Sequence, residues 1–231
     1  YLAEQAKKYP GKVYWTVGVT LTDSGAAAEV ERCVKELGAV AIGELGPGYG
    51  HYRVDDPRCF PVYEVARSLD IPLVLHAGPS TPQRLHLKNT DILAVDEVAV
   101  NFPELRIAIC HMGFPYFEET AFVITKNPNV YGEISWLPGI AGLNPSDPIL
   151  PTVVNPYFML DYPILYYFSQ TFGTRDKLIW GTDVADPRDS LNSVRTINQR
   201  LEKQGLPTIP QDAIDRMINE NWKKVFTKIP G

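Results

Sequence analysis

Residues 105–111 read Leu-Arg-Ile-Ala-Ile-Cys-His, an almost continuous apolar run that ends in a histidine. Apolar runs of this length predict strands that are buried on both faces, as in a parallel sheet covered by helices. Similar runs recur along the chain, and the expected strands are residues 13–20, 39–45, 72–77, 105–111, 129–135 and 177–182. Six such strands predict an α/β protein with one parallel sheet.

Helical patterns alternate with these strands. The expected helices are residues 25–37, 57–69, 90–101, 115–126, 161–172, 188–203 and 211–226. Regular strand–helix alternation predicts either an open doubly wound sheet or a (β/α)8 barrel. The nucleotide-binding form of the open sheet has no support, because the chain contains neither GxGxxG after its first strand nor GxxxxGK[ST]. Residues 137–156 are rich in proline, and we expect an ordered loop of the kind that often serves as a lid.

Length, composition and charge limit the class of protein. The chain has 231 residues, of which 45% are hydrophobic and 21% are charged, as in one ordinary globular domain. The net charge of −5 argues against a nucleic-acid-binding protein. No apolar run approaches the ~18 residues of a membrane-spanning helix. Cys33, Cys59 and Cys110 have no disulfide or zinc-finger spacing, so we expect a reducing, cytoplasmic location.

Polar residues recur where the expected strands end. Glu44, His76, His111, Trp136 and Asp183 each lie at or just after the end of such a run, and Glu133 precedes Trp136 in the same segment. In a parallel barrel the carboxyl ends of all strands lie on one rim, where barrel enzymes carry their chemistry. We therefore expect these side chains to converge on one site.

Histidines and carboxylates that converge in this way predict a divalent metal site. Neutral imidazole and carboxylate suit zinc, manganese or iron, and we expect zinc first, with manganese as the alternative. Cys110 precedes His111 in the same strand and is expected to face away from the site. We expect the substrate to be a small carboxylate. The candidate contacts are Tyr49 and His51 in the loop after Glu44, Arg84 as a carboxylate anchor, and Trp136.

Four segments resemble the amidohydrolase superfamily, specifically the amidohydrolase 2 group of metal-dependent TIM-barrel hydrolases. They are residues 73–78, 102–113, 127–135 and 177–183, which contain His76, His111 and Asp183 in the family's order and spacing. The resemblance implies a distorted (β/α)8 barrel whose visible strands are the third to the eighth. It implies that His76 is a metal ligand and that His111 is a second ligand or a catalytic imidazole. It also implies that Asp183 binds metal and shuttles the proton of the attacking water.

The first strand of this family ends in His-x-His, which the present sequence does not contain. We therefore expect residues 1–231 to form a single barrel domain that lacks its first one or two β/α units, and we expect a homo-oligomer. Residues 41–46, around Glu44, are similar to the fourth-strand segment of TatD-like hydrolases, where the glutamate is a metal ligand that can bridge two ions. Glu44 is thus a further candidate ligand.

The resemblance implies a hydrolase that acts on a small ester, lactone or amide through a metal-activated water. Two alternatives stay open. Some relatives of this group are non-oxidative, metal-dependent decarboxylases of aromatic or unsaturated carboxylic acids, in which Asp183 or His111 would protonate the carbon that loses carbon dioxide. The other alternative is a degenerate, non-catalytic barrel subunit, which would not bind metal stoichiometrically.

Overall fold

The computed structural model describes residues 1–80, 83–137, 160–170 and 175–230. In these residues one six-stranded sheet contains β1 (Thr16–Val17), β2 (Ala41–Leu45), β3 (Leu73–Leu75), β4 (Ile107–Ile109), β5 (Val130–Glu133) and β6 (Leu178–Ile179). Every neighbouring pair of strands is parallel. All six predicted strands are therefore confirmed, with bounds shorter than expected.

The strand order decides between the two architectures that the sequence left open. A doubly wound sheet reverses its winding at a switch point. Here the order runs from β1 to β6 without a reversal, so each crossover leads to the next strand, as in the wall of a TIM barrel. Within the described residues this wall is open, with β1 and β6 at its two edges.

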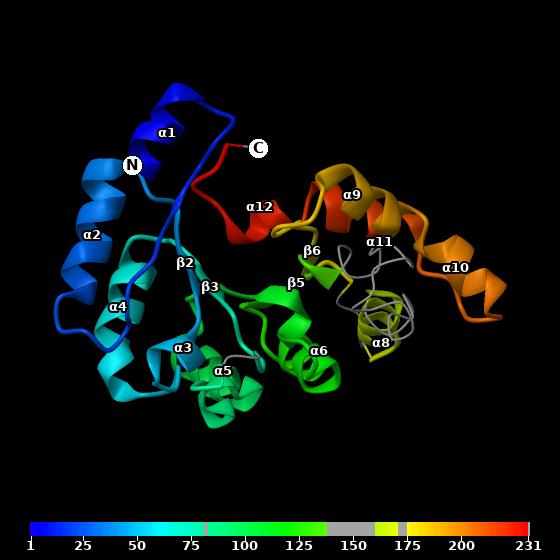
Figure 1. Cartoon of the computed structure of the whole chain (residues 1–231), viewed down its shortest axis with the longest axis horizontal. Helices are drawn as coiled ribbons and strands as arrows, with labels where there is room; N and C mark the ends of the chain where they lie inside the picture. The colour runs from blue at the N-terminus through cyan, green and yellow to red at the C-terminus, as the bar shows by residue number, and fades with distance from the viewer. Residues whose placement is uncertain (81–82, 138–159, 171–174, 231) are drawn as a thin grey trace.

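Helices cover the outer side of the curved sheet (Figure 1). They are α2 (Ala26–Leu37), α4 (Phe60–Ser68), α5 (Ile92–Asn101), α6 (Phe117–Lys126) and α8 (Tyr162–Gln170). Further along the chain follow α9 (Pro187–Arg195), α10 (Ile197–Lys203), α11 (Gln211–Asn219) and α12 (Trp222–Val225). Asp56 and Asp186 cap the helical segments that follow them, since they accept hydrogen bonds from the backbone N–H groups of Arg58 and Arg188.

Alternate strand residues face two different layers. Leu73, Leu75, Ile107 and Ile109 are buried in the large core beneath the outer helices. The strand residues that alternate with them point to the opposite face of the sheet. On that face Ala108 of β4 and Ile179 of β6 pack with Val225 in a second apolar cluster. Helix α12 thus covers the inner face of the sheet, on the side opposite the outer helices (Figure 1).

The helices differ from the prediction in four places. The expected helix 188–203 is split at Thr196 into α9 and α10, and the expected helix 211–226 is split before Asn221 into α11 and α12. The second break has a physical cause, because the buried Asn221 side chain donates a hydrogen bond to the Leu178 carbonyl of β6. The short helices α1 (Leu2–Lys8) and α3 (Pro47–Gly50) were not expected.

Two expectations fall partly or wholly outside the described residues. The expected helix 161–172 is observed as α8 up to residue 170, and residues 138–156 of the expected loop lie outside the described residues.

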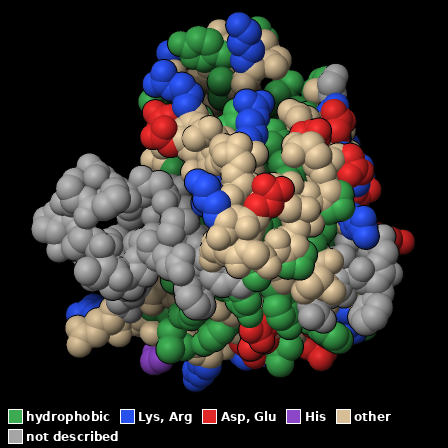
Figure 2. All heavy atoms as spheres, turned by 90° about the vertical axis from the view of Figure 1, so that its right-hand side faces the viewer, with side chains coloured by type: hydrophobic (Ala, Val, Ile, Leu, Met, Phe, Trp, Pro, Cys, Tyr) green, Lys and Arg blue, Asp and Glu red, His purple; other side chains and the backbone are tan. Residues whose placement is uncertain are grey.

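Basic and acidic side chains are interspersed on the molecular face shown in Figure 2, with no continuous basic patch in the part that the view shows. Of the helices in the described part of the chain, none has the length and apolar composition needed to cross a membrane.

Candidate functional site

The predicted site residues lie on the edge of the sheet formed by the carboxyl ends of its strands. Glu44 belongs to β2, His76 directly follows β3, and His111 lies in a short 3-10 turn, η3 (Cys110–Gly113), directly after β4. Glu133 is the last residue of β5, and Asp183 follows β6. Parallel pairing places all these strand ends on one edge.

Three of the residues form a compact cluster. The Nδ1 atom of His76 lies 2.7 Å from Oε1 of Glu44, and the Nε2 atom of His111 lies 3.5 Å from the same oxygen. The two imidazole rings meet edge to face, with their centroids 5.0 Å apart. The interactions with His111 and His76 lower the pKa of Glu44 to about 2, so this carboxylate is ionised at neutral pH.

The cluster fits a divalent metal ion. One potential ligand atom from each of Glu44, His76 and His111 lies within 4.8 Å of the others. Ligand atoms at about 2.0–2.2 Å from one ion are themselves about 2.8–3.6 Å apart at octahedral or tetrahedral angles, so a small adjustment of the side chains would suffice. One carboxylate and two imidazoles are also the donor types that zinc and manganese accept.

An irregularity in β2 allows Glu44 to reach the cluster. The register between β2 and β3 shifts between Ile42 and Leu45, as in a β-bulge. Gly43 has a φ of +144°, and a Cβ atom at this position would lie 2.5 Å from the carbonyl oxygen of Val74. Only glycine fits so close to the neighbouring strand. The next residue is Glu44, the carboxylate of the cluster.

The backbone after β4 corrects one prediction. Cys110 was expected to face away from the site, by alternation with His111. His111 has a left-handed backbone, with φ at +55°, so alternation does not continue beyond Cys110. Burial raises the pKa of the Cys110 thiol well above its usual value, and the nearby carboxylates of Glu133, Glu44 and Asp183 raise it further. Cys110 therefore lies beside the site as a neutral thiol.

Ser135, which the sequence analysis did not single out, and Glu133, which it placed at a strand end, hold His111. Nδ1 of His111 lies 3.0 Å from both the carbonyl oxygen and the Oγ atom of Ser135. Ser135 in turn donates from its backbone N–H and its hydroxyl to the two oxygens of Glu133, at 2.6 and 2.5 Å. The signal that could have found Ser135 is Glu-x-Ser at the end of β5, because residues two apart on an extended strand face the same side.

Burial shifts the pKa of both acid–base groups in this network. It raises the pKa of Glu133 to about 7, against the lowering effect of the hydrogen bonds from Ser135. Burial lowers the pKa of His111, but the contact with Glu44 and the hydrogen bond to the Ser135 carbonyl outweigh it, and the net shift is upward. The cluster therefore attracts a positive charge, either a proton on His111 or a cation.

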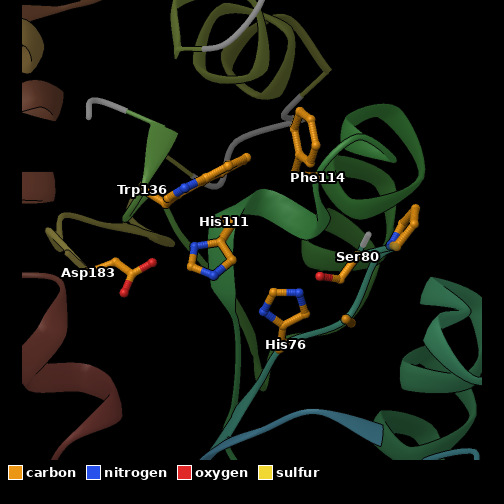
Figure 3. Close-up of a pocket in the computed structure, with 8 residues that line it drawn as sticks. His76, Ser80, His111, Phe114, Trp136 and Asp183 are labelled. Atoms are coloured by element: carbon orange, nitrogen blue, oxygen red, sulfur yellow. The ribbon is translucent and has the colours of Figure 1, made fainter. Parts of the chain in front are cut away.

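A pocket opens above the two histidines (Figure 3). Its volume is about 240 Å³, and a cavity of roughly 150 Å³ already holds benzene. The lining residues are His76, Ala77, Pro79, Ser80, His111, Phe114, Trp136 and Asp183. The lining is largely apolar, with a few polar groups at one side, which is typical of small-molecule sites.

Asp183 and Trp136 contribute to this pocket in different ways. Trp136 lies edge to face against Phe114, with ring centroids 5.0 Å apart, and its ring centroid lies 5.9 Å from that of His111. Asp183 is exposed and lines the pocket, but the compact group of potential ligand atoms does not include its carboxylate. In Figure 3 its carboxylate lies on the His111 side of the pocket.

The predicted substrate contacts are not all at the pocket. The Tyr49 hydroxyl lies 2.6 Å from Oγ of Ser80, a lining residue, and its ring packs against His76. His51 lies instead in a separate surface hollow, where its ring contacts that of His86. Arg84 is exposed and is not among the lining residues of the pocket. Loop positions such as these do not follow from strand periodicity.

The sequence matches the family described as amidohydrolase over residues 1–226, and the chain belongs to this family. A 2-keto-4-carboxy-3-hexenedioate hydratase from Sphingobium sp. is 33% identical over 104 residues, which cover 39% of this chain and 30% of the hydratase. A gamma-resorcylate decarboxylase from Polaromonas sp. is 30% identical over 145 residues, which cover 50% of this chain and 44% of the decarboxylase. The matched segments thus span less than half the length of these curated relatives.

Solved structures share the fold. An uncharacterised TIM-barrel protein from Bordetella bronchiseptica superposes with a TM-score of 0.64 at 17% identity, covering 99% of this chain and 71% of that one. A dihydroxybenzoic acid decarboxylase from Polaromonas sp., solved with bound manganese and 2-nitroresorcinol, superposes with a TM-score of 0.65 at 17% identity, covering 100% and 74%. These likenesses confirm the α/β barrel-type fold.

Proposed function

We propose that the protein is a metal-dependent, non-oxidative decarboxylase of an aromatic carboxylic acid. The observation that carries the proposal is the pocket of about 240 Å³ beside Glu44, His76 and His111, which Phe114 and Trp136 line with aromatic rings. The relatives named above are a hydratase and decarboxylases. They favour decarboxylation over the hydrolysis of an ester, lactone or amide that the sequence resemblance first implied.

The cation would be held by Glu44, His76 and His111, with Asp183 as a further ligand or as an acid–base group. Bound there, a divalent cation would supply positive charge for the substrate carboxylate and a neighbouring oxygen. Manganese is supported by the Polaromonas decarboxylase structure, and zinc by the imidazole and carboxylate donors of this chain.

The residues around the pocket suggest how the reaction would proceed. Phe114 and Trp136 would hold the ring of the substrate, and Ser80, with Tyr49 behind it, would contact a ring hydroxyl. The bond between ring carbon and carboxylate breaks, carbon dioxide leaves, and the electron pair stays on the carbon. Asp183, which lines the pocket together with His111, then delivers a proton to that carbon.

The test is carbon dioxide release from a panel of hydroxybenzoates, including 2,6-dihydroxybenzoate and 5-carboxyvanillate, by the protein loaded with manganese or zinc. We expect turnover with at least one acid. We expect it to be lost in Asp183→Asn, since general acid catalysis contributes roughly 10²–10⁴-fold, and in His111→Asn, since that change removes a metal ligand. Metal-loaded protein that releases no carbon dioxide, or undiminished turnover in Asp183→Asn, would refute the proposal.

The other candidate functions predict different products. Hydration of an unsaturated keto acid is the second candidate, because the Sphingobium hydratase is 33% identical over its matched segment, and it predicts loss of the conjugated double bond without carbon dioxide. Hydrolysis predicts acid release from esters or lactones. A degenerate, non-catalytic barrel predicts no stoichiometric metal, so metal analysis of the purified protein separates it from all three.

We further propose that β1 to β6 correspond to the third to eighth strands of a complete barrel and that the protein is a homo-oligomer. The open wall between β1 and β6 in the described residues supports the first point. The second point stays a prediction from the sequence. Light scattering of the purified protein would measure its oligomeric state.

A further inference from the structure

We propose that Glu133 and Ser135 form a positioning relay that holds His111 with its proton on Nδ1, so that Nε2 presents a free lone pair to the metal cluster. The inference concerns the site of the proposed function and deepens it. It stands on hydrogen-bond geometry in the described residues.

The first step is the tautomer of His111. Its Nδ1 atom lies 3.0 Å from the carbonyl oxygen of Ser135. A carbonyl oxygen can only accept a hydrogen bond, so Nδ1 must carry the proton and donate. In the neutral ring Nε2 is then unprotonated, and this is the atom that faces Glu44 Oε1 at 3.5 Å. An imidazole nitrogen binds a metal through such a lone pair.

The second step is the direction of the serine hydroxyl. The Oγ atom of Ser135 lies 3.0 Å from Nδ1 of His111 and 2.5 Å from Oε2 of Glu133. The hydroxyl has one proton, and at alkaline pH the carboxylate of Glu133 is ionised and can only accept, so the proton points at Glu133. The serine oxygen is left as a second acceptor for the Nδ1 proton. Both acceptors of Ser135 therefore favour the same tautomer.

Glu133 holds Ser135 in place. Glu133 binds the backbone N–H of Ser135 through Oε1 and its hydroxyl through Oε2, which sets both the main chain and the side chain. Ser135 and His111 are each only 6% exposed, so little water competes for these bonds. A Cβ atom on Gly181 would lie 2.1 Å from Oε1 of Glu133, so the backbone just after β6 packs closely against the carboxylate.

Replacing Glu133 by glutamine tests the relay because it keeps the shape and reverses one hydrogen bond. The glutamine oxygen accepts from the Ser135 N–H, and its NH2 group donates to Oγ. The serine proton is then released toward His111 Nδ1, which favours the proton on Nε2 instead. Ser135→Ala removes one of the two acceptors, and Ser135→Thr restores it.

The tautomer is read by ¹⁵N NMR of histidine-labelled, metal-free protein at the alkaline end of the His111 titration, with the signals assigned by His111→Asn. We expect the Nδ1–H form in the wild type and in Ser135→Thr. We expect a clear rise of the Nε2–H form in Glu133→Gln, and a smaller change in Ser135→Ala. A wild-type ring protonated on Nε2, or an unchanged tautomer in Glu133→Gln, would overturn the relay.

Zinc affinity, measured by calorimetry, gives a second readout. We expect Glu133→Gln to bind zinc about 10–100-fold more weakly, as is typical when the partner of a metal-binding histidine is lost. Glu104→Gln is the matched control, because Glu104 is an exposed acid that pairs with Arg67 on the outer surface. Equal zinc affinity in wild type and Glu133→Gln would count against the relay.

The relay and the proposed function fail separately. If the tautomer shifts as expected but no carboxylic acid is decarboxylated, the relay stands and the proposed reaction is wrong. If decarboxylation is found but the tautomer and the zinc affinity do not change in Glu133→Gln, the reaction stands and Glu133 serves only to hold the end of β5.

Discussion

Gly181 has no side chain, and this leaves room for the carboxylate of Glu133 beside Ser135. A Cβ atom at this position would lie 2.1 Å from Glu133 Oε1 and 3.2 Å from the Cβ atom of Ser135. We predict that Gly181→Ala displaces the carboxylate and weakens metal binding roughly 10-fold or more, with an overpacking cost of about 1–3 kcal/mol. Calorimetric metal titration and urea unfolding measure the two effects.

Gly18 provides the matched control for that substitution. A Cβ atom added at Gly18 meets nothing within 4 Å, and its backbone needs no positive φ. Gly18→Ala should therefore leave metal affinity unchanged. Wild-type metal affinity in Gly181→Ala would show that the contact around Glu133 does not matter for the cluster.

Lys177 is a buried lysine that is not part of the candidate site, and it makes the stability of the fold depend on pH. Its side chain is only 8% exposed and donates to the carbonyl oxygens of Ile124 and Asn127. Burial lowers its pKa from 10.5 to about 8. Between these two values the unfolded chain holds a proton that the folded chain has lost, so stability rises with pH across this window.

We predict that, between pH 8 and pH 10, the unfolding free energy of the wild type rises by about 2 kcal/mol relative to that of Lys177→Met. The methionine cannot titrate, so the difference between the two proteins isolates Lys177 from the other groups. Urea unfolding at pH 8, 9 and 10 provides the measurement. A difference that stays constant over this range would mean that the lysine is charged in the folded protein throughout.

At the level of residues, the sequence predicted the site only where strands position it. Glu44, His76 and His111 could be found because parallel strand ends share one edge, and the structure brings these three together. His51 and Arg84 lie in loops, whose course depends on packing that no local pattern encodes. The role of Glu133 depends on its hydrogen bonds with Ser135. These bonds cannot be predicted from a single acidic residue at the end of a strand.

A buried ion pair joins α10 to Asp161, the residue directly before α8. Two of the three guanidinium nitrogens of Arg200, Nε and Nη2, donate to the carboxylate of Asp161, at 2.8 and 2.6 Å, and the Asp161 side chain is fully buried. We predict that Asp161→Asn destabilises the protein by about 3 kcal/mol, because it leaves a largely buried cation without its partner. Denaturant unfolding measures the change.

The exposed pair between Asp212 and Arg216 is the control at this scale. Its side chains are 69% and 35% exposed, and such pairs contribute about 0–1 kcal/mol. Asp212→Asn should thus change stability by less than 1 kcal/mol. If the two substitutions cost the same, the link between α8 and α10 is not held by this ion pair.

Whole elements were easier to predict than their exact ends. All six strands were found because buried parallel strands are nearly continuous apolar runs, as in Ile107–Ile109. The single helix expected over residues 188–203 was wrong, because a turn at Thr196 interrupts an otherwise continuous amphipathic pattern. The break before α12 was hidden for a different reason. It depends on the bond from Asn221 to β6, a contact between segments 43 residues apart.

For the molecule as a whole, metal binding should appear as added stability. A ligand that binds only the folded state contributes about 2.7 kcal/mol at 100 times its dissociation constant. We predict that manganese or zinc raises the melting temperature of the wild type and that a chelator reverses the rise. The rise should disappear in His76→Asn and persist in His86→Asn, since His86 lies in the separate hollow beside His51.

A melting temperature that still rises in His76→Asn would place the bound ion away from the cluster of Glu44, His76 and His111. Differential scanning fluorimetry over a range of metal concentrations is sufficient for this comparison. It tests the donor set without requiring that any substrate be turned over.

Helix α12 also bears on how the chain is made. It covers the inner face of the sheet with Val225, but it follows all six strands in the chain. Roughly 40 residues separate it from β6, which is a few seconds of synthesis at ~5–20 residues per second. During that interval we expect the apolar side chains of Ala108 and Ile179 to lack the cover that α12 gives them in the folded protein. The incomplete chain should therefore be most prone to aggregation just before α12 is made.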